Sequence, residues 1–271
     1  MPAKAFVAVP FTCYEESVAL AMDRACAPKA LAGQERVMIK PNLVNDSPFP
    51  VTTPPALCEA VIRYVRAHSD ATVVLAEGSG DPTLETMEIF DLLGYTRMAS
   101  RLGVDLMDLN REPLVRLKRD GCRVFPEMHL PQVAFTHFLI SVPVLKAHSL
   151  SGMTGTLKNM MGLAPPKFYS GRWGTWKKAA FHGRMQESLA DLARYRVPDF
   201  TVLDATVGLA EYHLGGPVLS PAPNLILAGA DPWAVDRHAA RLLSLDWRSV
   251  GHLARPKKEP ETHEPLKGAL E

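Results

Sequence analysis

The chain has 271 residues, of which 47% are hydrophobic and 22% are charged, and its formal net charge is +1. This length and composition allow one large or two small globular units with a substantial core. A net charge near zero gives no electrostatic reason to expect a nucleic acid as the main partner, and we expect none. We also expect no membrane span, because no apolar run approaches the length that crosses a bilayer.

Four cysteines are scattered along the chain, at Cys13, Cys26, Cys58 and Cys122. No pair has CxxC spacing, which argues against a zinc ribbon or an iron–sulfur cluster held by local cysteines. Isolated cysteines are typical of a reducing compartment. The first ten residues form too short an apolar run for a signal peptide, and acidic residues soon follow them. We therefore expect a cytoplasmic protein.

Hydrophobic periodicity predicts strands that alternate with helices. The predicted strands are residues 5–9, 36–39, 71–76, 104–108, 135–144, 200–203 and 225–227. The predicted helices are residues 15–27, 54–67, 83–93, 97–102, 182–194, 232–243 and 246–253. Pro28 is expected to end the first helix. This alternation predicts an α/β fold with a mostly parallel sheet and helices on both faces.

No linker divides the chain, so we predict a single domain over residues 1–254 and a flexible tail at 255–271. Two segments, 109–132 and 164–181, are expected to be insertions over a crevice at the strand ends. The first is predicted to be a hairpin or covering segment. The second contains Tyr169, Trp173 and Trp176 in a loop-like composition, which suits either a lid or a surface contact.

Residues 141–162 carry the densest set of reactive side chains. They hold Lys146, His148, Thr154, Lys158 and Asn159, together with two loop glycines. A buried strand that opens into a glycine-containing loop and then a helix is where α/β proteins usually place ligands. Lysines and the start of a helix favour negative charge, and histidine titrates near neutral pH. The P-loop spacing and GxGxxG are both absent, so nucleotide hydrolysis and the usual dinucleotide fold are unsupported.

Polar residues also follow three other predicted strands. Lys40 and Asn42 follow residues 36–39, Glu77 and Ser79 follow residues 71–76, and Asp204 follows residues 200–203. Since the carboxyl ends of parallel strands meet at one edge of a sheet, these side chains are expected to converge. The alternative is that these residues have structural roles only, with Lys40 as a lysine at the edge of the sheet and Asn42 as a turn former.

The same motifs resemble a bacterial and archaeal family grouped as domain of unknown function 362. The matching pieces run in the family's order: 40–44, 52–54, 60–62, 78–80, 146–150, 153–162, His182, 204–205 and 230–236. The resemblance implies a fold but no reaction. Many relatives carry a ferredoxin-like iron–sulfur module, for which this chain has no cysteine pattern. Relatives also have a Gly-x-Glu-Gly-x-Gly-Pro run after the aspartate, whereas Glu211 here lies one position late.

The sequence favours an enzyme that binds a small anionic metabolite, carrying phosphate or carboxylate, through Lys40, Lys146 and Lys158. His148 or His182 is expected to act as acid or base, with Asp204 orienting it and Lys146 also taking part in catalysis. The other expected substrate-binding residues are Asn42, Ser79, Thr154, Gly155 and Asn159.

Two alternatives stay open. A divalent metal held by His148, His182, Asp204 or Glu77 is a variant of the enzyme, although no HxH or HExxH spacing supports it. The other is a non-catalytic protein that binds a cofactor or serves a redox partner through residues 169–176. The sequence also leaves a homo-oligomer open.

Overall fold

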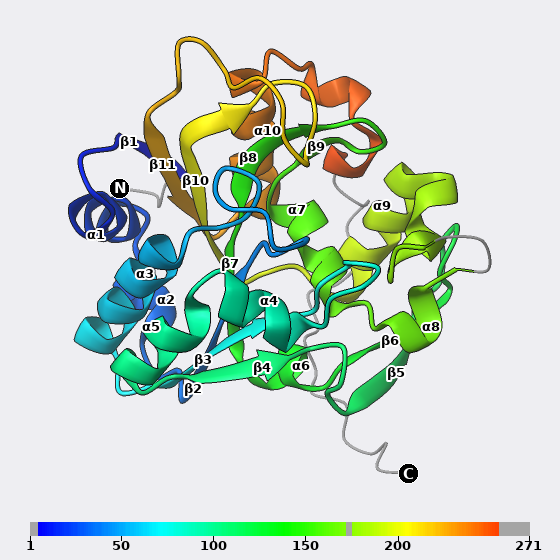
Figure 1. Ribbon diagram of the computed structural model, residues 1–271, viewed down its shortest axis with the longest axis horizontal. Helices are drawn as coiled ribbons and strands as arrows, with labels where there is room; N and C mark the ends of the chain where they lie inside the picture. The colour runs from blue at the N-terminus through cyan, green and yellow to red at the C-terminus, as the bar shows by residue number, and fades with distance from the viewer. Residues whose placement is uncertain (1–4, 172–174, 255–271) are drawn as a thin grey trace.

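The computed structural model describes residues 5–171 and 175–254. Within these residues, one sheet has the strand order β1-β11-β10-β7-β2-β3-β4, with β8 paired to β10 and β9 to β8 (Figure 1). Its strands are β1 (Val7–Pro10), β2 (Arg36–Pro41), β3 (Thr72–Glu77), β4 (Asp105–Asp108), β7 (Phe138–Val142), β8 (Val144–His148), β9 (Gly152–Thr154), β10 (Phe200–Leu209) and β11 (Leu225–Gly229). The pairs joining β10, β7, β2, β3 and β4 are parallel, whereas β11, β1 and β9 pair antiparallel to their neighbours. The sheet is therefore mostly parallel, as predicted.

Helices cover both faces of this sheet, which confirms the α/β prediction (Figure 1). The α-helices are α1 (Tyr14–Arg24), α2 (Ala27–Leu31), α3 (Pro55–His68), α4 (Thr86–Leu92), α5 (Tyr95–Leu102), α6 (Val133–Thr136), α7 (Thr156–Asn159), α8 (Pro166–Tyr169), α9 (Met185–Tyr195) and α10 (Pro232–Leu242). Short 3-10 helices are η1 (Met160–Leu163), η2 (Ala179–Arg184), η3 (Trp247–Ser249) and η4 (Gly251–Leu253). A separate antiparallel hairpin, β5 (Leu114–Lys118) and β6 (Glu127–Pro131), confirms the hairpin expected in 109–132.

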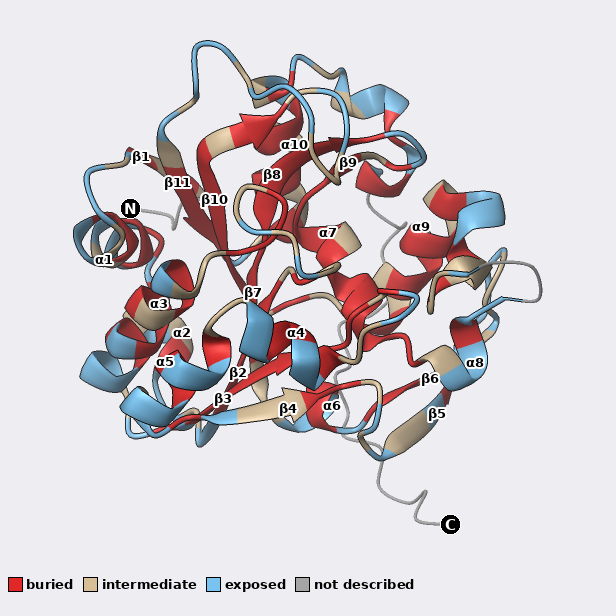
Figure 2. Cartoon of the chain, viewed as in Figure 1, coloured by how far each residue is buried: buried red, intermediate tan, exposed pale blue. Residues whose placement is uncertain are grey.

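The pleat of the strands divides the core into two sides. On β2, Val37 and Ile39 pack into a cluster with α1, α3 and α5, whereas Met38 packs into a cluster with α9. Successive side chains point to opposite faces of a sheet, so a strand buried on both sides is apolar throughout. Figure 2 shows the central strands buried along their length. By the same alternation, Lys40 faces the side of Met38, toward α7 and α9.

The predicted strand 135–144 differs from the structure in a way that matters for the site. Pro143 separates β7 from β8, because proline has no N–H to donate to a sheet. The chain then continues as β8, so Lys146 and His148 lie on a strand and not in a loop. Strand β8 pairs with β9, which sets Lys146 opposite Thr154.

Among the other differences from prediction, three concern a site residue or a proline. Strand β10 continues to Leu209, so Asp204 lies in its middle and not at its end. Helix α1 ends at Arg24, and Pro28 lies in the first turn of α2, where its missing N–H is tolerated. The predicted helix 182–194 begins at Met185, and His182 belongs to the preceding 3-10 helix. Trp173 and the predicted tail lie outside the described residues.

None of the helices within residues 5–171 and 175–254 has both the length and the apolar character needed to span a bilayer.

Candidate functional site

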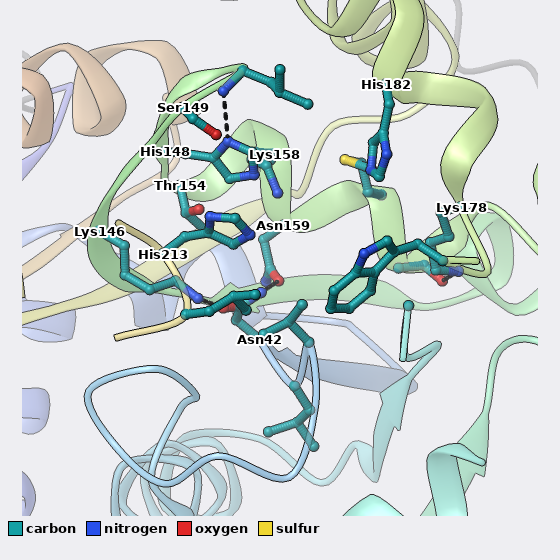
Figure 3. A pocket seen from close by; sticks show the side chains of 18 of the residues that line it. Asn42, Lys146, His148, Ser149, Thr154, Lys158, Asn159, Lys178, His182 and His213 are labelled. Carbon is teal, nitrogen blue, oxygen red and sulfur yellow. Dashed lines mark hydrogen bonds between the residues drawn. The ribbon is translucent and has the colours of Figure 1, made fainter. Parts of the chain in front are cut away.

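A cavity of about 300 Å³ lies where β2 and β3 end beside the β8–β9 hairpin (Figure 3). It is lined by Asn42, Leu43, Val44, Glu77, Gly78, Gly80, Lys146, His148, Ser149, Leu150, Thr154, Lys158, Asn159, Met161, Gly162, Trp176, Lys178, His182, Tyr212, His213 and Leu214. These residues come from five stretches of the chain that are far apart in sequence. The convergence predicted from the strand ends therefore holds for most of the expected positions.

The buried side of the cavity rests on an ion pair between Lys40 and Glu77. The Lys40 Nζ lies 2.8 Å from each carboxylate oxygen of Glu77, and both side chains are buried. Glu77 also accepts hydrogen bonds from the backbone N–H groups of Leu43 and Gly78. Lys40 itself does not line the cavity. Lys40, which was expected to bind substrate, instead donates to the Glu77 carboxylate on the buried side of the cavity.

A chain of side-chain hydrogen bonds leads from this pair into the cavity. Asn159 Oδ1 accepts from Lys40 Nζ and from Asn42 Nδ2, both at 3.3 Å. Asn42 Oδ1 in turn accepts from Lys146 Nζ at 2.9 Å. Lys146 also donates to the carbonyl of Val51 at 2.6 Å, so its ammonium is held by neutral oxygens alone. Burial lowers the pKa of Lys146 well below its ordinary value, and the charge of Lys158 lowers it further.

Two more lysines line the same cavity. Lys178 donates to Asn110 Oδ1 at 2.9 Å and to the carbonyls of Gly162 and Ala164, and burial lowers its pKa to about 7. The Lys158 ammonium has no hydrogen bond or ion pair with any residue that the structure describes. Burial lowers the pKa of Lys158 to about 8, and the charge of Lys40 contributes.

Three histidines surround the position of Lys158. The rings of His148 and His213 stack with centroids 3.8 Å apart, and His182 lies across the cavity from them (Figure 3). Burial lowers the pKa of each of the three, and the charge of Lys158 is the second cause in every case. All three imidazoles are therefore neutral near pH 7.

The hydrogen bonds of His148 define its tautomer. Its Nδ1 accepts from the backbone N–H of Leu150 at 3.1 Å and, more weakly, from that of Ser151 at 3.4 Å. An acceptor nitrogen carries no proton, so the proton of the neutral ring is assigned to Nε2. His148 can thus donate a hydrogen bond through Nε2, whereas either an acid or a base role was expected for His148 or His182.

The start of α7, expected to receive a ligand, is occupied by a carboxylate of the protein. Asp236 on α10 accepts hydrogen bonds from the backbone N–H groups of Thr156 at 2.7 Å and Leu157 at 2.9 Å. Burial raises the pKa of Asp236 to about 6. A Cβ on Gly155 would lie 2.5 Å from the Asp236 carboxylate, so glycine is needed there for packing.

Glycines also allow the close contact between η1 and the end of β3. A Cβ on Gly162 would collide with Glu77 Oε1 and with the end of the Lys40 side chain. A Cβ on Gly78 would likewise collide with the Gly162 carbonyl. The two glycines therefore let η1 pack directly over the Lys40–Glu77 pair.

Besides Lys40, three predicted site residues lie outside the cavity lining. Asp204 accepts from the Tyr14 hydroxyl at 2.7 Å and from the backbone N–H and hydroxyl of Thr206, so it does not orient a histidine. Ser79 donates to the carbonyl of Val44 and shapes the loop after β3. Gly155 serves the contact with Asp236 described above. Asp204 and Ser79 thus make hydrogen bonds within the scaffold, and Gly155 is needed for packing against Asp236.

The structure adds residues that sequence reasoning did not select. Lys178 and Trp176 enter from the segment 164–181, which was recognised only as an insertion with aromatic side chains. His213 and its neighbour Tyr212 enter from the loop after β10, where the chain departs from the pattern of its relatives. This departure from the family pattern marked the loop as unusual, but it did not show that the loop reaches the cavity.

Residues 5–171 and 175–254 contain no cluster of side chains that is arranged to bind a metal ion. No group of three or more His, Cys, Asp or Glu side chains there is arranged to hold a metal ion. His148 and His182 share the cavity, but Asp204 lies apart and Glu77 is engaged by Lys40. The proposed metal ligands therefore do not form one site.

The fold and the cavity define an α/β protein with a lysine- and histidine-lined pocket at its strand ends. The family model described as Domain of unknown function (DUF362) matches residues 37–241, and the chain belongs to this family. The match includes every residue of the cavity lining, from Asn42 to Leu214. A search of curated proteins finds no match to this chain.

Proposed function

We propose that this protein is an enzyme that binds a small metabolite carrying phosphate or carboxylate in the cavity and acts on it by acid–base chemistry. The observation that carries this proposal is an imbalance of charge. Lys146, Lys158 and Lys178 line the cavity, whereas Glu77 is the one carboxylate among its described lining residues and is paired with Lys40. A bound anion would supply the missing negative charge.

The pKa values of these lysines support this argument. Buried ammonium groups are unfavourable unless an opposite charge lies close to them. Lys146 and Lys178 are held by neutral oxygens, and their pKa values are lowered by burial. An anion within a few ångströms would reverse this effect and favour the charged lysines. Binding of the metabolite is therefore expected to be coupled to proton uptake.

The size of the cavity and its unused polar groups point to a small ligand. Its volume of about 300 Å³ lies at the low end of the range usual for ligand sites. Thr154 Oγ1 and His213 Nδ1 are buried without a hydrogen-bond partner in the described structure. Such groups are costly unless a water or a ligand satisfies them. Together with the Lys158 ammonium, which has no partner among the described residues, they offer hydrogen bonds to the oxygens of a phosphate or carboxylate.

The acid and base roles fall to residues on opposite sides of the cavity, with His182 on one side and His148 on the other (Figure 3). His182 is neutral near pH 7, since its pKa is lowered by burial and by Lys158, and it can accept a proton. His148 can donate a hydrogen bond through Nε2, and Lys146 can stabilise negative charge that develops on the substrate. Asn42 and the Val51 carbonyl position Lys146 for this role.

The alternative of a non-catalytic binding protein has less support. It calls for a flat aromatic and basic face, whereas these lysines and histidines face a cavity. We place the activity in the cytoplasm because scattered single cysteines suit a reducing compartment.

A substrate panel tests the proposal. Phosphorylated and carboxylated metabolites are screened for thermal stabilisation of the protein and then for turnover. Lys158→Gln is expected to lose the stabilisation, and His182→Asn is expected to keep binding while losing turnover. Lys29→Gln removes an exposed lysine on α2 outside the cavity and serves as the matched control. Stabilisation that is unchanged in Lys158→Gln contradicts the proposal.

A further inference from the structure

The four buried or half-buried lysines around the cavity are not equivalent. Lys40 is paired with Glu77, Lys146 donates to Asn42 and Val51, and Lys178 donates to Asn110 and to two backbone carbonyls. Each of these three amines is fixed by acceptors of the scaffold. Lys158 lines the cavity and has no such acceptor within the described residues. Its amine can therefore turn toward a bound molecule without breaking a hydrogen bond to any described residue.

We propose that Lys158 is a nucleophile that forms a Schiff base with a carbonyl group of the bound metabolite. This inference rests on the proposed function and narrows its substrate class to small aldehydes or ketones that also carry phosphate or carboxylate. A neutral amine is the reactive form of lysine, and desolvation or a neighbouring cation is the usual way in which proteins produce it. Lys158 has both, since it is enclosed by the cavity and flanked by other lysines.

The position of Lys158 supports this assignment. Lys158 lines the same cavity as His148, His213 and His182 (Figure 3), and its charge is the second cause of the lowered pKa of all three. Its own pKa of about 8 leaves a useful fraction of free amine at neutral pH, far more than for an ordinary lysine. No carboxylate of the described lining competes for the proton, because Glu77 is held by Lys40.

The reaction is balanced without an oxidant or reductant. The lone pair of Lys158 Nζ forms a bond to the carbonyl carbon, the carbonyl oxygen takes up a proton, and the nitrogen gives up one of its own, which leaves a neutral carbinolamine. The C–O bond then breaks, the hydroxyl group leaves as water after gaining a second proton, and a protonated imine remains. His182 can carry these protons, and Nε2 of His148 can donate a hydrogen bond to the departing oxygen. Lys146 and Lys178 remain available for the phosphate or carboxylate group.

Reductive trapping of the full chain tests this inference. The protein is incubated at pH 7 with glyoxylate and cyanoborohydride, which converts the imine into a stable carboxymethyl group on the lysine. Peptide mapping is expected to find Lys158 modified at least about tenfold faster than the exposed Lys29. Modification of Lys158 should reach its half-maximal rate near pH 8, and phosphate should slow it by competition.

Lys158→Arg separates the two proposals, because arginine keeps the positive charge but forms no Schiff base under these conditions. This variant is expected to lose the adduct while retaining more phosphate affinity, measured by calorimetry, than Lys158→Gln. If phosphate binds and Lys158 is modified no faster than Lys29, the Schiff base is contradicted and anion binding stands. If phosphate and glyoxylate both fail to bind, the proposed function fails as well. If uncharged propionaldehyde modifies Lys158 as fast as glyoxylate does, the anionic substrate class is wrong.

Discussion

Lys40 Nζ lies 2.8 Å from both carboxylate oxygens of Glu77, and this buried ion pair joins the ends of β2 and β3 beside the cavity. The pair neutralises the carboxylate that would otherwise balance the cavity lysines. It also fixes Asn159 through the hydrogen bond from Lys40. The same contact therefore supports the scaffold and leaves the cavity positively charged.

Removing one member of this pair should destabilise the protein strongly. Lys40→Met leaves the Glu77 carboxylate buried without its partner, at an expected cost of about 3–5 kcal/mol in the free energy of unfolding. Lys40→Met combined with Glu77→Gln should recover part of this loss, because the buried charge is then gone. Urea unfolding of the two variants measures the difference. Wild-type stability of Lys40→Met would contradict a structural role for the pair.

Gly162→Ala should be far more harmful than an alanine at a glycine with free space. Its Cβ would collide with Glu77 and Lys40, so either η1 or the ion pair has to move, at about 1–3 kcal/mol or more. Gly183→Ala is the control, because a Cβ there meets nothing within 4 Å. Thermal unfolding compares the two variants. Equal melting temperatures would show that η1 does not pack against the pair as described.

Asp236→Asn should weaken the attachment of α7 to α10. The carboxylate accepts from the N–H groups of Thr156 and Leu157, and an asparagine amide can replace only one of its two oxygens. The expected loss is about 1–3 kcal/mol, because one backbone N–H is left buried without a partner. The exposed Asp246→Asn serves as a control for the loss of a helix-cap carboxylate. Urea unfolding with no difference between the variants would refute the role of Asp236.

The lysines of the cavity predict an unusual dependence of stability on pH. The folded pKa is about 8 for Lys158 and about 7 for Lys178, both lowered by burial, whereas unfolded lysine titrates near 10.4. Between these values the unfolded chain binds more protons, so stability rises with pH. The destabilisation by these lysines is complete below their folded pKa values and is relieved as pH rises above them.

Urea unfolding of the ligand-free protein between pH 7 and pH 9 should therefore show increasing stability. The window ends near pH 9, because burial raises the pKa of Cys58 to about 12 and deprotonation of the unfolded thiol then favours unfolding. Lys158→Met should reduce the slope, and saturating phosphate should do the same by keeping the lysines protonated. A flat profile for the wild type would contradict the burial of uncompensated lysines.

Much of the fold followed from periodicity, because strands buried on both faces are continuous apolar runs and amphipathic helices repeat every three to four residues. The failures occurred where one residue decides a local outcome. Pro143 divides an apolar run into β7 and β8, and Pro28 begins a helix where it was expected to end one. Neither outcome can be read from a window of hydrophobicity.

The site was predictable where a strand end carried the residue and unpredictable where the contact was long-range. Asn42, Lys146 and Asn159 were found because polar residues follow or interrupt buried strands. Asp204 was misplaced because its partner Tyr14 lies 190 residues away on α1. Lys178 and His213 were missed because they lie in loops away from the strand ends. The sequence does not show that these loops fold back over the cavity.

The most direct measurement is a calorimetric titration of phosphate, and of glyoxylate in parallel, into the wild type, Lys158→Gln and Lys29→Gln at pH 8. We expect saturable binding to the wild type with proton uptake, seen as a binding heat that varies with the ionisation heat of the buffer. Affinity should be at least about tenfold weaker in Lys158→Gln and unchanged in Lys29→Gln, because a hydrogen bond to a charged group contributes about 1.5–3 kcal/mol. Equal affinities in all three proteins, or no binding of either anion to the wild type, would contradict an anion site in this cavity.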